Sequence, residues 1–467
     1  MRGNFDMAES PLRLRPLLAS LKDRAISCEA LAKHCLKQEQ THRALNAFIR
    51  LNPVLLEEAK ALDDRLRAGE FLPLHGIPVA VKDNIETAGI ETTGGAVALA
   101  GYVPRADASV VARLKAAGAL VVGKTNLDEL AGAGSTLSSL GGRTLNPFDP
   151  RRTPAGSSGG SAVAVAIGAC VLALGTETVN SIRNPAHVCG VAGLRPTRGL
   201  VGLSGVIPVS PTMDVVGPMG AGVEELATML GVMIGHDVGR FAAERWPKVA
   251  GLRVGILRGL FGAGAEHHAI NAALETSLHH LHSAGAVLVE VADPVFDSGR
   301  LYQDLALHAY EFQSAFNGWL LSLEDAAPIA DFCAYVADGR WPASTMKSLL
   351  DTAMATPDPA ASDGYRAKRH AIADMAAMMN DLARNRRLDA FAYPAQQRPA
   401  LPIGEPSRPE RNGVLASALG WPALNVPVAA IEADGLSLPV GLDLMAPPLN
   451  EPTLFALGYA IETAMRR

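Results

Sequence analysis

The sequence predicts an α/β protein in which a β-sheet carries helices on both of its faces. The chain has 467 residues, of which 48% are hydrophobic and 19% charged, so it can bury a large core. The phrase LKAAGALVV at residues 114–122 recurs as LHSAGAVLV at residues 281–289, and each copy joins a helical pattern to a strand pattern. Two such units indicate helices layered on a sheet, although the phrase is too common in α/β proteins to indicate an internal repeat.

The first part of the chain contains clear helix and strand patterns. Residues 1–70 are predicted to form a helical segment, because apolar residues recur there at helical spacing. Residues 76–82, GIPVAVK, are an apolar, β-branched run that is typical of a buried strand. A helix is predicted from an N-cap at Asp107 to Gly118, followed by a strand at residues 119–122.

The last part of the chain is predicted to be helical first and then to complete the sheet. The helical stretch, residues 295–385, holds a group of aromatic residues that either pack in the core or form a wall of a substrate pocket: Tyr302, Tyr310, Phe312, Phe316 and Trp319. Three strand-like runs follow, at residues 391–394, 421–428 and 438–445. No linker composition interrupts the chain, which predicts one domain over residues 1–467.

Charge, cysteine content and hydropathy exclude several classes of function. The net charge is −5 and no run of Lys or Arg occurs, so neither a nucleic acid nor a membrane is an expected partner. The apolar run at residues 162–174 is too short to span a bilayer and predicts a buried helix. The N-terminus lacks a signal-peptide pattern, and Met7 leaves open whether residues 1–6 are native. The five scattered cysteines predict reduced thiols in a cytoplasmic protein without a metal site: Cys28, Cys35, Cys170, Cys189 and Cys333.

Lys82 stands at the end of the predicted strand at residues 76–82. Burial there disfavours the ammonium form and lowers the pKa of the side chain, which allows a lysine to act as a general base. A lysine that pairs with Asp83 or another carboxylate is the alternative interpretation, and Lys82 alone does not decide between the two.

A loop rich in Gly and Ser, residues 156–161, precedes the predicted helix at residues 162–174. Glycines allow backbone N–H groups to approach a bound group closely, and a serine here could equally serve as a simple helix N-cap. The spacing matches neither Gly-x-Gly-x-x-Gly nor the P-loop pattern, which disfavours a nucleotide site.

A turn of small residues leads to Ser181. Successive N–H groups of Thr178, Val179, Asn180 and Ser181 are predicted to point at one oxyanion, with Ser181 as the nucleophile beside them. No Gly-x-Ser-x-Gly elbow surrounds Ser157 or Ser181, and the nearest histidine, His187, is interpreted as structural.

Together these segments resemble the amidase signature family of Ser-Ser-Lys hydrolases. The resemblance is strong over a signature core at residues 76–220, which contains GIPVAVKDN, GKTNLDELA, NPFDPRRTPAGSSGGSAVAVA, GTETVNSIRNPAHVCGVAGLRPT and GVIPVSPTMDVVGPM. It implies Lys82 as general base, Ser157 as bridging serine and Ser181 as nucleophile. It also implies a large mixed β-sheet flanked by helices on both faces, no metal and no organic cofactor.

The chain departs from the family pattern around the nucleophile. The family phrase Asp-Thr-Gly-Gly-Ser is replaced here by Glu177-Thr-Val-Asn-Ser181, and Asn184 stands before Pro185, where an apolar residue is usual. Backbone N–H donors survive a change of side chain, so we expect an altered substrate shape rather than lost catalysis. Arg183 is expected to brace the turn by pairing with an acidic neighbour such as Asp214.

The predicted function is hydrolysis of the C–N bond of a small amide, aryl amide or carbamate (urethane). Ser181 forms an acyl-enzyme, and Ser157 and Lys82 relay the proton. A glutaminase subunit of a tRNA amidotransferase is one alternative; it would need partner subunits, and the aromatic residues at 302–319 favour an apolar or aryl substrate over glutamine. A catalytically silent binding homologue is the other. The sequence sets neither the substrate nor the oligomeric state, and a homodimer rests on family analogy alone.

Overall fold

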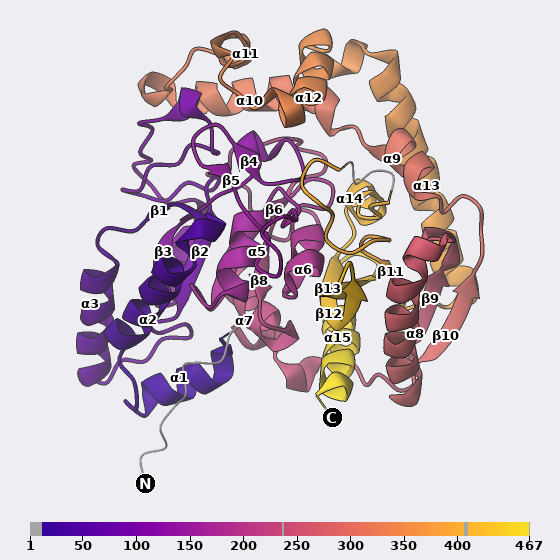
Figure 1. The fold of residues 1–467 in the computed structure, drawn as a ribbon, viewed down its shortest axis with the longest axis horizontal. Helices are drawn as coiled ribbons and strands as arrows, with labels where there is room; N and C mark the ends of the chain where they lie inside the picture. Colours follow the sequence, from indigo (N-terminus) through magenta and orange to yellow (C-terminus); the bar gives the residue numbers. More distant parts are fainter. Residues whose placement is uncertain (1–11, 236–237, 406–409, 467) are drawn as a thin grey trace.

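The computed structural model describes residues 12–235, 238–405 and 410–466, so the alternative start at Met7 lies outside the described residues. An eleven-stranded sheet runs through the whole molecule (Figure 1). Parallel pairs such as β2–β3, β2–β6 and β9–β10 lie on either side of a central run of antiparallel pairs, which includes β6–β8 and β12–β13. In spatial order the strands are β1 (Phe48–Leu51), β3 (Leu120–Thr125), β2 (Pro78–Lys82), β6 (Leu172–Glu177), β8 (Val215–Gly220), β7 (Ala192–Arg195), β12 (Ala423–Ala433), β13 (Leu436–Met445), β11 (Ala390–Pro394), β9 (Arg253–Leu257) and β10 (Val287–Val291).

Helices cover both faces of this sheet. A Cβ on Gly175 of β6 would meet Ser158 and Ile182, which adjoin α5 and α6. Leu172 of the same strand instead lies close to Leu226 of α7. Positions 172 and 175 point to opposite faces of a strand, so α5 and α7 lie on opposite sides. The described helices are α1 (Leu14–Lys22), α2 (Cys28–Thr41), α3 (Leu55–Arg67), α4 (Ser109–Ala116), α5 (Gly159–Ala166), α6 (Arg183–Cys189), α7 (Val223–Met233), α8 (His268–Ser283), α9 (Ser298–Leu305), α10 (His308–Ser322), α11 (Phe332–Asp338), α12 (Ala343–Ala355), α13 (Asp363–Arg386), α14 (Val414–Leu419) and α15 (Glu451–Met465). The predicted fold class is confirmed.

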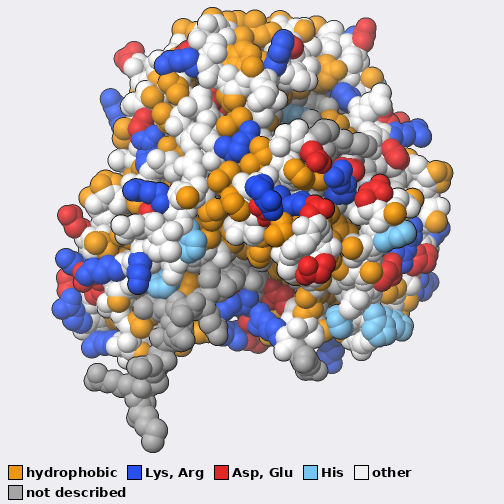
Figure 2. Space-filling model, in the orientation of Figure 1, with side chains coloured by type: hydrophobic (Ala, Val, Ile, Leu, Met, Phe, Trp, Pro, Cys, Tyr) orange, Lys and Arg blue, Asp and Glu red, His pale blue; other side chains and the backbone are white. Residues whose placement is uncertain are grey.

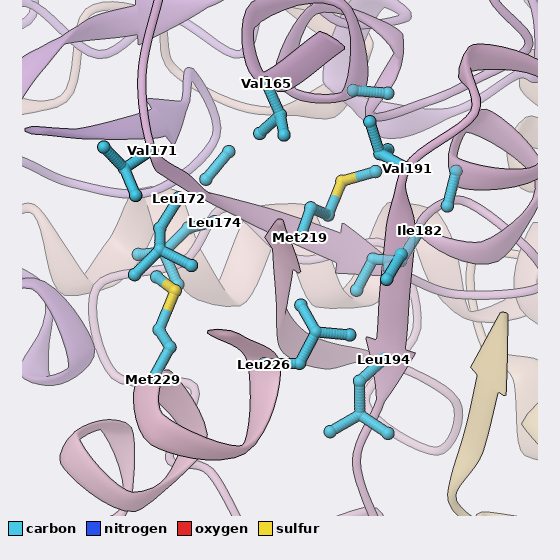
Figure 3. Packing of buried hydrophobic residues seen from close by; sticks show 14 of the residues in the cluster. Val165, Val171, Leu172, Leu174, Ile182, Val191, Leu194, Met219, Leu226 and Met229 are labelled. Carbon is cyan, nitrogen blue, oxygen red and sulfur yellow. The ribbon is translucent and has the colours of Figure 1, made fainter. Parts of the chain in front are cut away.

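The centre of the core is apolar on both sides of β6 and β8. Figure 3 shows Leu172 and Leu174 of β6 beside Met229 of α7, with Val165 of α5 on another side of the cluster. Ile182 belongs to the same cluster and is fully buried, although it directly follows Ser181. The chain after the candidate nucleophile is therefore anchored in the hydrophobic core.

Helices α9 to α13 form an arch across the top and right side of Figure 1. Phe312, Phe316 and Trp319 of α10 are buried in a cluster with Leu130 and Ile207, so they are packing residues. The predicted helical character of residues 295–385 is confirmed, but these three aromatic rings form no substrate wall.

Three local predictions were wrong. The predicted helical segment at residues 1–70 contains an edge strand, β1. Asp107 does not cap α4; its carboxylate instead accepts a hydrogen bond from the N–H of Ala88 at 2.8 Å. The apolar run at residues 162–174 is not one helix, because α5 ends at Ala166 and the chain turns at Gly168 with φ +70° before β6 begins.

The surface carries no single-sign stripe on the face shown in Figure 2, where acidic and basic residues are interspersed. Of the helices that the structure describes, none has the length and apolar character needed to cross a bilayer. All five cysteines are free thiols, as predicted, and only Cys333 is exposed. The assignment of the chain to one domain stays a prediction.

Candidate active site

Neighbouring strands bring the predicted residues to one edge of the sheet. β2 and β6 run parallel, with Val81 opposite Leu174, so their carboxyl ends lie side by side. Lys82 ends β2, and Thr176 lies near the end of β6. Ser157 stands in the loop before α5, and Ser181 follows β6 in the turn before α6.

Lys82 is fully buried and contacts Ser157 directly. Its Nζ atom lies 2.6 Å from the Oγ atom of Ser157 and 2.8 Å from the Oγ1 atom of Thr176. A third contact, to the Thr176 carbonyl oxygen, measures 3.2 Å. Asn84 donates a hydrogen bond to the same Thr176 hydroxyl at 3.0 Å, which fixes the threonine against the lysine. The alternative in which Lys82 pairs directly with Asp83 is therefore wrong; Asp83 instead lies 3.5 Å from Lys124.

Burial lowers the pKa of Lys82 to about 7. The charges of Asp128, Asp214 and Glu177 oppose this effect, because a nearby negative charge favours the ammonium form, but desolvation is the larger influence. At neutral pH a substantial share of the Lys82 side chains is therefore neutral and able to accept a proton.

The loop that holds Ser157 has no room for a side chain at Gly156, where a Cβ would lie 2.0 Å from the Oδ2 atom of Asp128. The peptide bond between Gly156 and Ser157 is cis. Asp128 also donates its backbone N–H to the Ser157 carbonyl oxygen at 3.3 Å. Its carboxylate is held in turn by the backbone N–H of Ser135 at 2.8 Å, and burial raises its pKa. Asp128 thus contacts the serine loop through both its backbone and its carboxylate.

Ser158 does not cap α5, so the simple capping interpretation of this loop was wrong. Its hydroxyl donates to the Thr176 carbonyl oxygen at 3.1 Å, and its backbone N–H donates to the Ser181 carbonyl oxygen at 3.1 Å. The segments that carry Ser157 and Ser181 are therefore joined by a direct backbone hydrogen bond.

The turn from Thr178 to Ser181 has its amides available. Within the described residues, none of the four backbone N–H groups donates a hydrogen bond, and no residue of the turn has a positive φ. The Val179 carbonyl oxygen accepts from the Ser417 hydroxyl at 2.6 Å. The turn therefore accommodates Val179 and Asn180 without the left-handed backbone that would require glycine.

A buried ion cluster braces this turn, and Arg183 pairs there with acidic residues as predicted, although Asp214, the neighbour named as an example, is not one of them. Arg183 pairs with Glu177 at 2.8 Å and with Asp443 at 2.6 Å, and all three side chains are buried. Asp214 instead accepts from the Thr178 hydroxyl at 2.7 Å. Glu177 also accepts from the Ile182 N–H at 3.0 Å. The acidic residue that departs from the family phrase precedes the turn, and its carboxylate therefore binds the residue that follows the turn.

Two further residues singled out in the sequence lie on α6. His187 is fully buried, its Nδ1 atom contacts the backbone of Gly441, and desolvation lowers its pKa to about 4; its structural interpretation fits this environment. Asn184 is also buried, and its side-chain amide has no hydrogen-bond partner among the described residues.

A cavity of about 850 Å³ lies between the signature core and the helical arch. Residues 132–135 line it from the core side, and a Cβ on Gly156 would contact Gly134 and Ser135, so this lining adjoins the Ser157 loop. Lys82, Ser157 and Ser181 do not line the cavity themselves. From the arch it is lined by, among others, Tyr302, His308, Tyr310, Leu349 and Lys368.

Sequence reasoning missed two residues that contact the site. Asp128 lies within the quoted motif GKTNLDELA, so its place in the motif was the available signal. Thr176 likewise lies within the quoted motif GTETVNSIRNPAHVCGVAGLRPT, but its contact with Lys82 depends on the pairing of β2 with β6. Across the described ranges, no group of three or more His, Cys, Asp or Glu residues is arranged to hold a metal ion.

Known proteins resemble this chain over most of its length. A family model described as Amidase matches residues 29–455. A glutamyl-tRNA(Gln) amidotransferase subunit of Deinococcus radiodurans is 35% identical over 93% of both chains, and the same subunit of a Synechococcus strain is 34% identical over 96% of this chain and 91% of its own. The structure of native peptide amidase from Stenotrophomonas maltophilia matches with a TM-score of 0.88 at 33% identity, over 97% of each chain. The corresponding amidotransferase subunit from Thermotoga maritima matches with a TM-score of 0.76 at 26% identity, over 99% of this chain and 96% of its own.

Proposed function

We propose, because the chain belongs to the amidase family, that it hydrolyses an amide-type C–N bond through an acyl-enzyme on Ser181. The observation that carries this proposal is the contact of 2.6 Å between the buried Lys82 Nζ atom and the Ser157 hydroxyl. A serine hydroxyl is a weak nucleophile without an adjacent base, and a lysine that is partly neutral at pH 7 is such a base.

In the proposed reaction the proton moves along a relay from Ser181 through Ser157 to Lys82, and the link from Ser157 to Lys82 is the contact of 2.6 Å. Neutral Lys82 takes a proton from Ser157, and Ser157 takes one from Ser181 as the Ser181 oxygen attacks the substrate carbonyl carbon. The backbone N–H groups of residues 178–181 stabilise the tetrahedral oxyanion, at about 3–4 kcal/mol for a well-placed donor. The proton returns through Ser157 to the leaving nitrogen, and water then hydrolyses the ester bond to Ser181.

We expect the activity to rise with pH through about 7, the pKa of Lys82. Below that value the lysine is protonated and cannot accept a proton, so kcat/KM should fall by about tenfold for each further pH unit. Above it the neutral form predominates and the rate should level off. A series of kcat/KM measurements between about pH 5 and pH 9 tests this; a profile that falls as the pH rises through 7 would contradict the role of Lys82 as base.

The proposed substrate is a small amide, aryl amide or carbamate bound partly in the cavity of about 850 Å³. This volume is within the range of roughly 300–1,000 Å³ typical of small-molecule sites. Residues 295–385 supply one wall, and the signature core supplies the other, next to the Ser157 loop. The likeness to peptide amidase supports an enzyme that acts on an amide bond.

A glutaminase subunit is the second candidate, and the curated relatives favour it more directly than the first. The amidotransferase subunits of Deinococcus radiodurans and Synechococcus are 34–35% identical to this chain over nearly its whole length. Phe312, Phe316 and Trp319 are buried in the core, so these three rings do not favour an aryl substrate over glutamine. In this second role, the chain would act on glutamine together with partner chains.

A substrate panel separates these candidates. Purified wild-type protein is incubated with 4-nitroanilides, primary amides, aryl carbamates and glutamine, and released nitroaniline, phenol or ammonia is measured, with Ser181→Ala as the blank. We expect turnover of at least one small amide or carbamate by the wild type alone. The second candidate would instead be established if glutamine were the only substrate of the panel that is hydrolysed, and if ammonia were released from it only after partner subunits are added. Inertness toward the whole panel would favour the catalytically silent homologue.

A further inference from the structure

Glu311, on helix α10 of the arch, reaches into the signature core and is not used by the proposed mechanism. Its side chain is buried, and it accepts hydrogen bonds from the hydroxyls of Ser210 at 2.5 Å, Thr212 at 2.9 Å and Tyr365 at 2.7 Å. The N–H of Thr212 approaches the same carboxylate at 3.3 Å. Tyr365 belongs to α13, so a single carboxylate ties two helices of the arch to the loop at residues 209–214.

That loop also holds the turn of the candidate nucleophile. Asp214 accepts hydrogen bonds from the N–H groups of Val209 at 2.8 Å and Ser210 at 2.9 Å through one carboxylate oxygen. Its other oxygen accepts from the Thr178 hydroxyl at 2.7 Å. Ser210 is therefore shared, because its hydroxyl binds Glu311 while its N–H binds Asp214.

We propose that Glu311 is a positioning residue that fixes the Thr178–Ser181 turn through Ser210 and Asp214. This inference rests on the proposed function, because the turn matters to catalysis only if its N–H groups stabilise the oxyanion. Glu311 does not line the cavity of about 850 Å³ and has no contact with Lys82, Ser157 or Ser181 among the described residues. Its effect is therefore exerted on kcat rather than on KM.

The chemistry of a carboxylate suits this role. Both oxygens of Glu311 accept, and all the groups around them can donate. A glutamine at this position would keep the shape but turn an NH₂ group toward at least one of these donors, which loosens the loop. A misplaced oxyanion donor lowers the rate even when the substrate binds as before.

The test measures the rate at which a fluorophosphonate labels Ser181, since this reaction needs the nucleophile and the oxyanion donors but no knowledge of the substrate. We expect Glu311→Gln to be labelled about tenfold more slowly than the wild type, with kcat for a panel substrate lowered in parallel and KM unchanged. Tyr365→Phe, which leaves the other donors in place, should slow labelling by about two- to threefold. It also keeps the proposal testable if Glu311→Gln fails to fold.

Tyr102→Phe is the matched control. Its hydroxyl donates to Glu86 at 3.0 Å, and Glu86 keeps a second donor in Trp319 at 3.1 Å. The substitution therefore removes the same type of bond as Tyr365→Phe, but among the described residues neither Tyr102 nor Glu86 has a hydrogen bond to the 209–214 loop. We expect it to be labelled at the wild-type rate.

A double-mutant cycle with Thr178→Val separates positioning from a general loss of stability. Thr178→Val removes the hydroxyl that binds Asp214, so Glu311→Gln should lower the labelling rate by less than about twofold in that background. The proposal would be overturned if the labelling-rate losses of Glu311→Gln and Thr178→Val multiplied in the double variant. Equal labelling rates for the wild type and Glu311→Gln would also overturn it. If the wild type itself is not labelled, the proposed function fails and the role of Glu311 fails with it.

Discussion

Replacing Ser181 with alanine is expected to remove hydrolytic turnover almost completely, by on the order of 10⁴-fold or more. No other group takes over the attack, because Ser157 is fully buried and lies against Lys82. The fold should be retained, since the turn is tied to the Ser157 loop through the Ser181 backbone rather than through its side chain. Its carbonyl oxygen still accepts from Ser158, and alanine keeps that bond.

Turnover of a panel substrate and thermal unfolding of the same preparations check this prediction. A Ser181→Ala protein that is folded and retains more than about a hundredth of the wild-type rate would show that another residue attacks the substrate. Ser157→Ala is the companion variant, because it interrupts the relay without removing the nucleophile and should retain more activity than Ser181→Ala.

Replacing Lys82 with alanine is expected to lower kcat by about 10²- to 10⁴-fold, the usual contribution of a general base. The substitution removes the proton acceptor, while the Ser181 turn keeps its anchors at Glu177 and Asp214. Because Lys82 is fully buried, Lys82→Met is the better-matched variant, as it leaves a smaller cavity.

The measurement is single-turnover and steady-state kinetics on both variants, with circular dichroism to confirm the fold. Both should also lose the rise of activity through pH 7 that is expected of the wild type. Wild-type activity in a correctly folded Lys82→Met protein would contradict the relay, whatever the substrate.

The sequence was informative where chemistry depends on short motifs. The meeting of Lys82 with Ser157, and of the Ser157 loop with Ser181, follows from segments that each carry their own pattern of Gly, Ser and apolar residues. The sequence assigned Lys82 to the candidate site through its motif, whereas the parallel pairing of β2 with β6, which brings it beside Thr176, is a tertiary contact.

Other features could not be read from the chain because they depend on tertiary contacts. An apolar run that is buried on all sides looks the same whether it is helix or strand, and residues 162–174 contain both the end of α5 and the start of β6. The partner of Arg183 includes Asp443, and the partners of Ser210 include Glu311, each more than 100 residues away in the chain. Local periodicity carries no information about such pairs.

The site at which the acyl group is attached during turnover identifies the nucleophile without any assumption about the natural substrate. The wild type is mixed with an activated ester or aryl carbamate that deacylates slowly, quenched with acid, digested and mapped by tandem mass spectrometry. We predict a covalent adduct with the mass of the acyl group on Ser181, absent from Ser181→Ala. An adduct on Ser157 or on the exposed thiol of Cys333, or turnover without any adduct, would contradict Ser181 as the nucleophile.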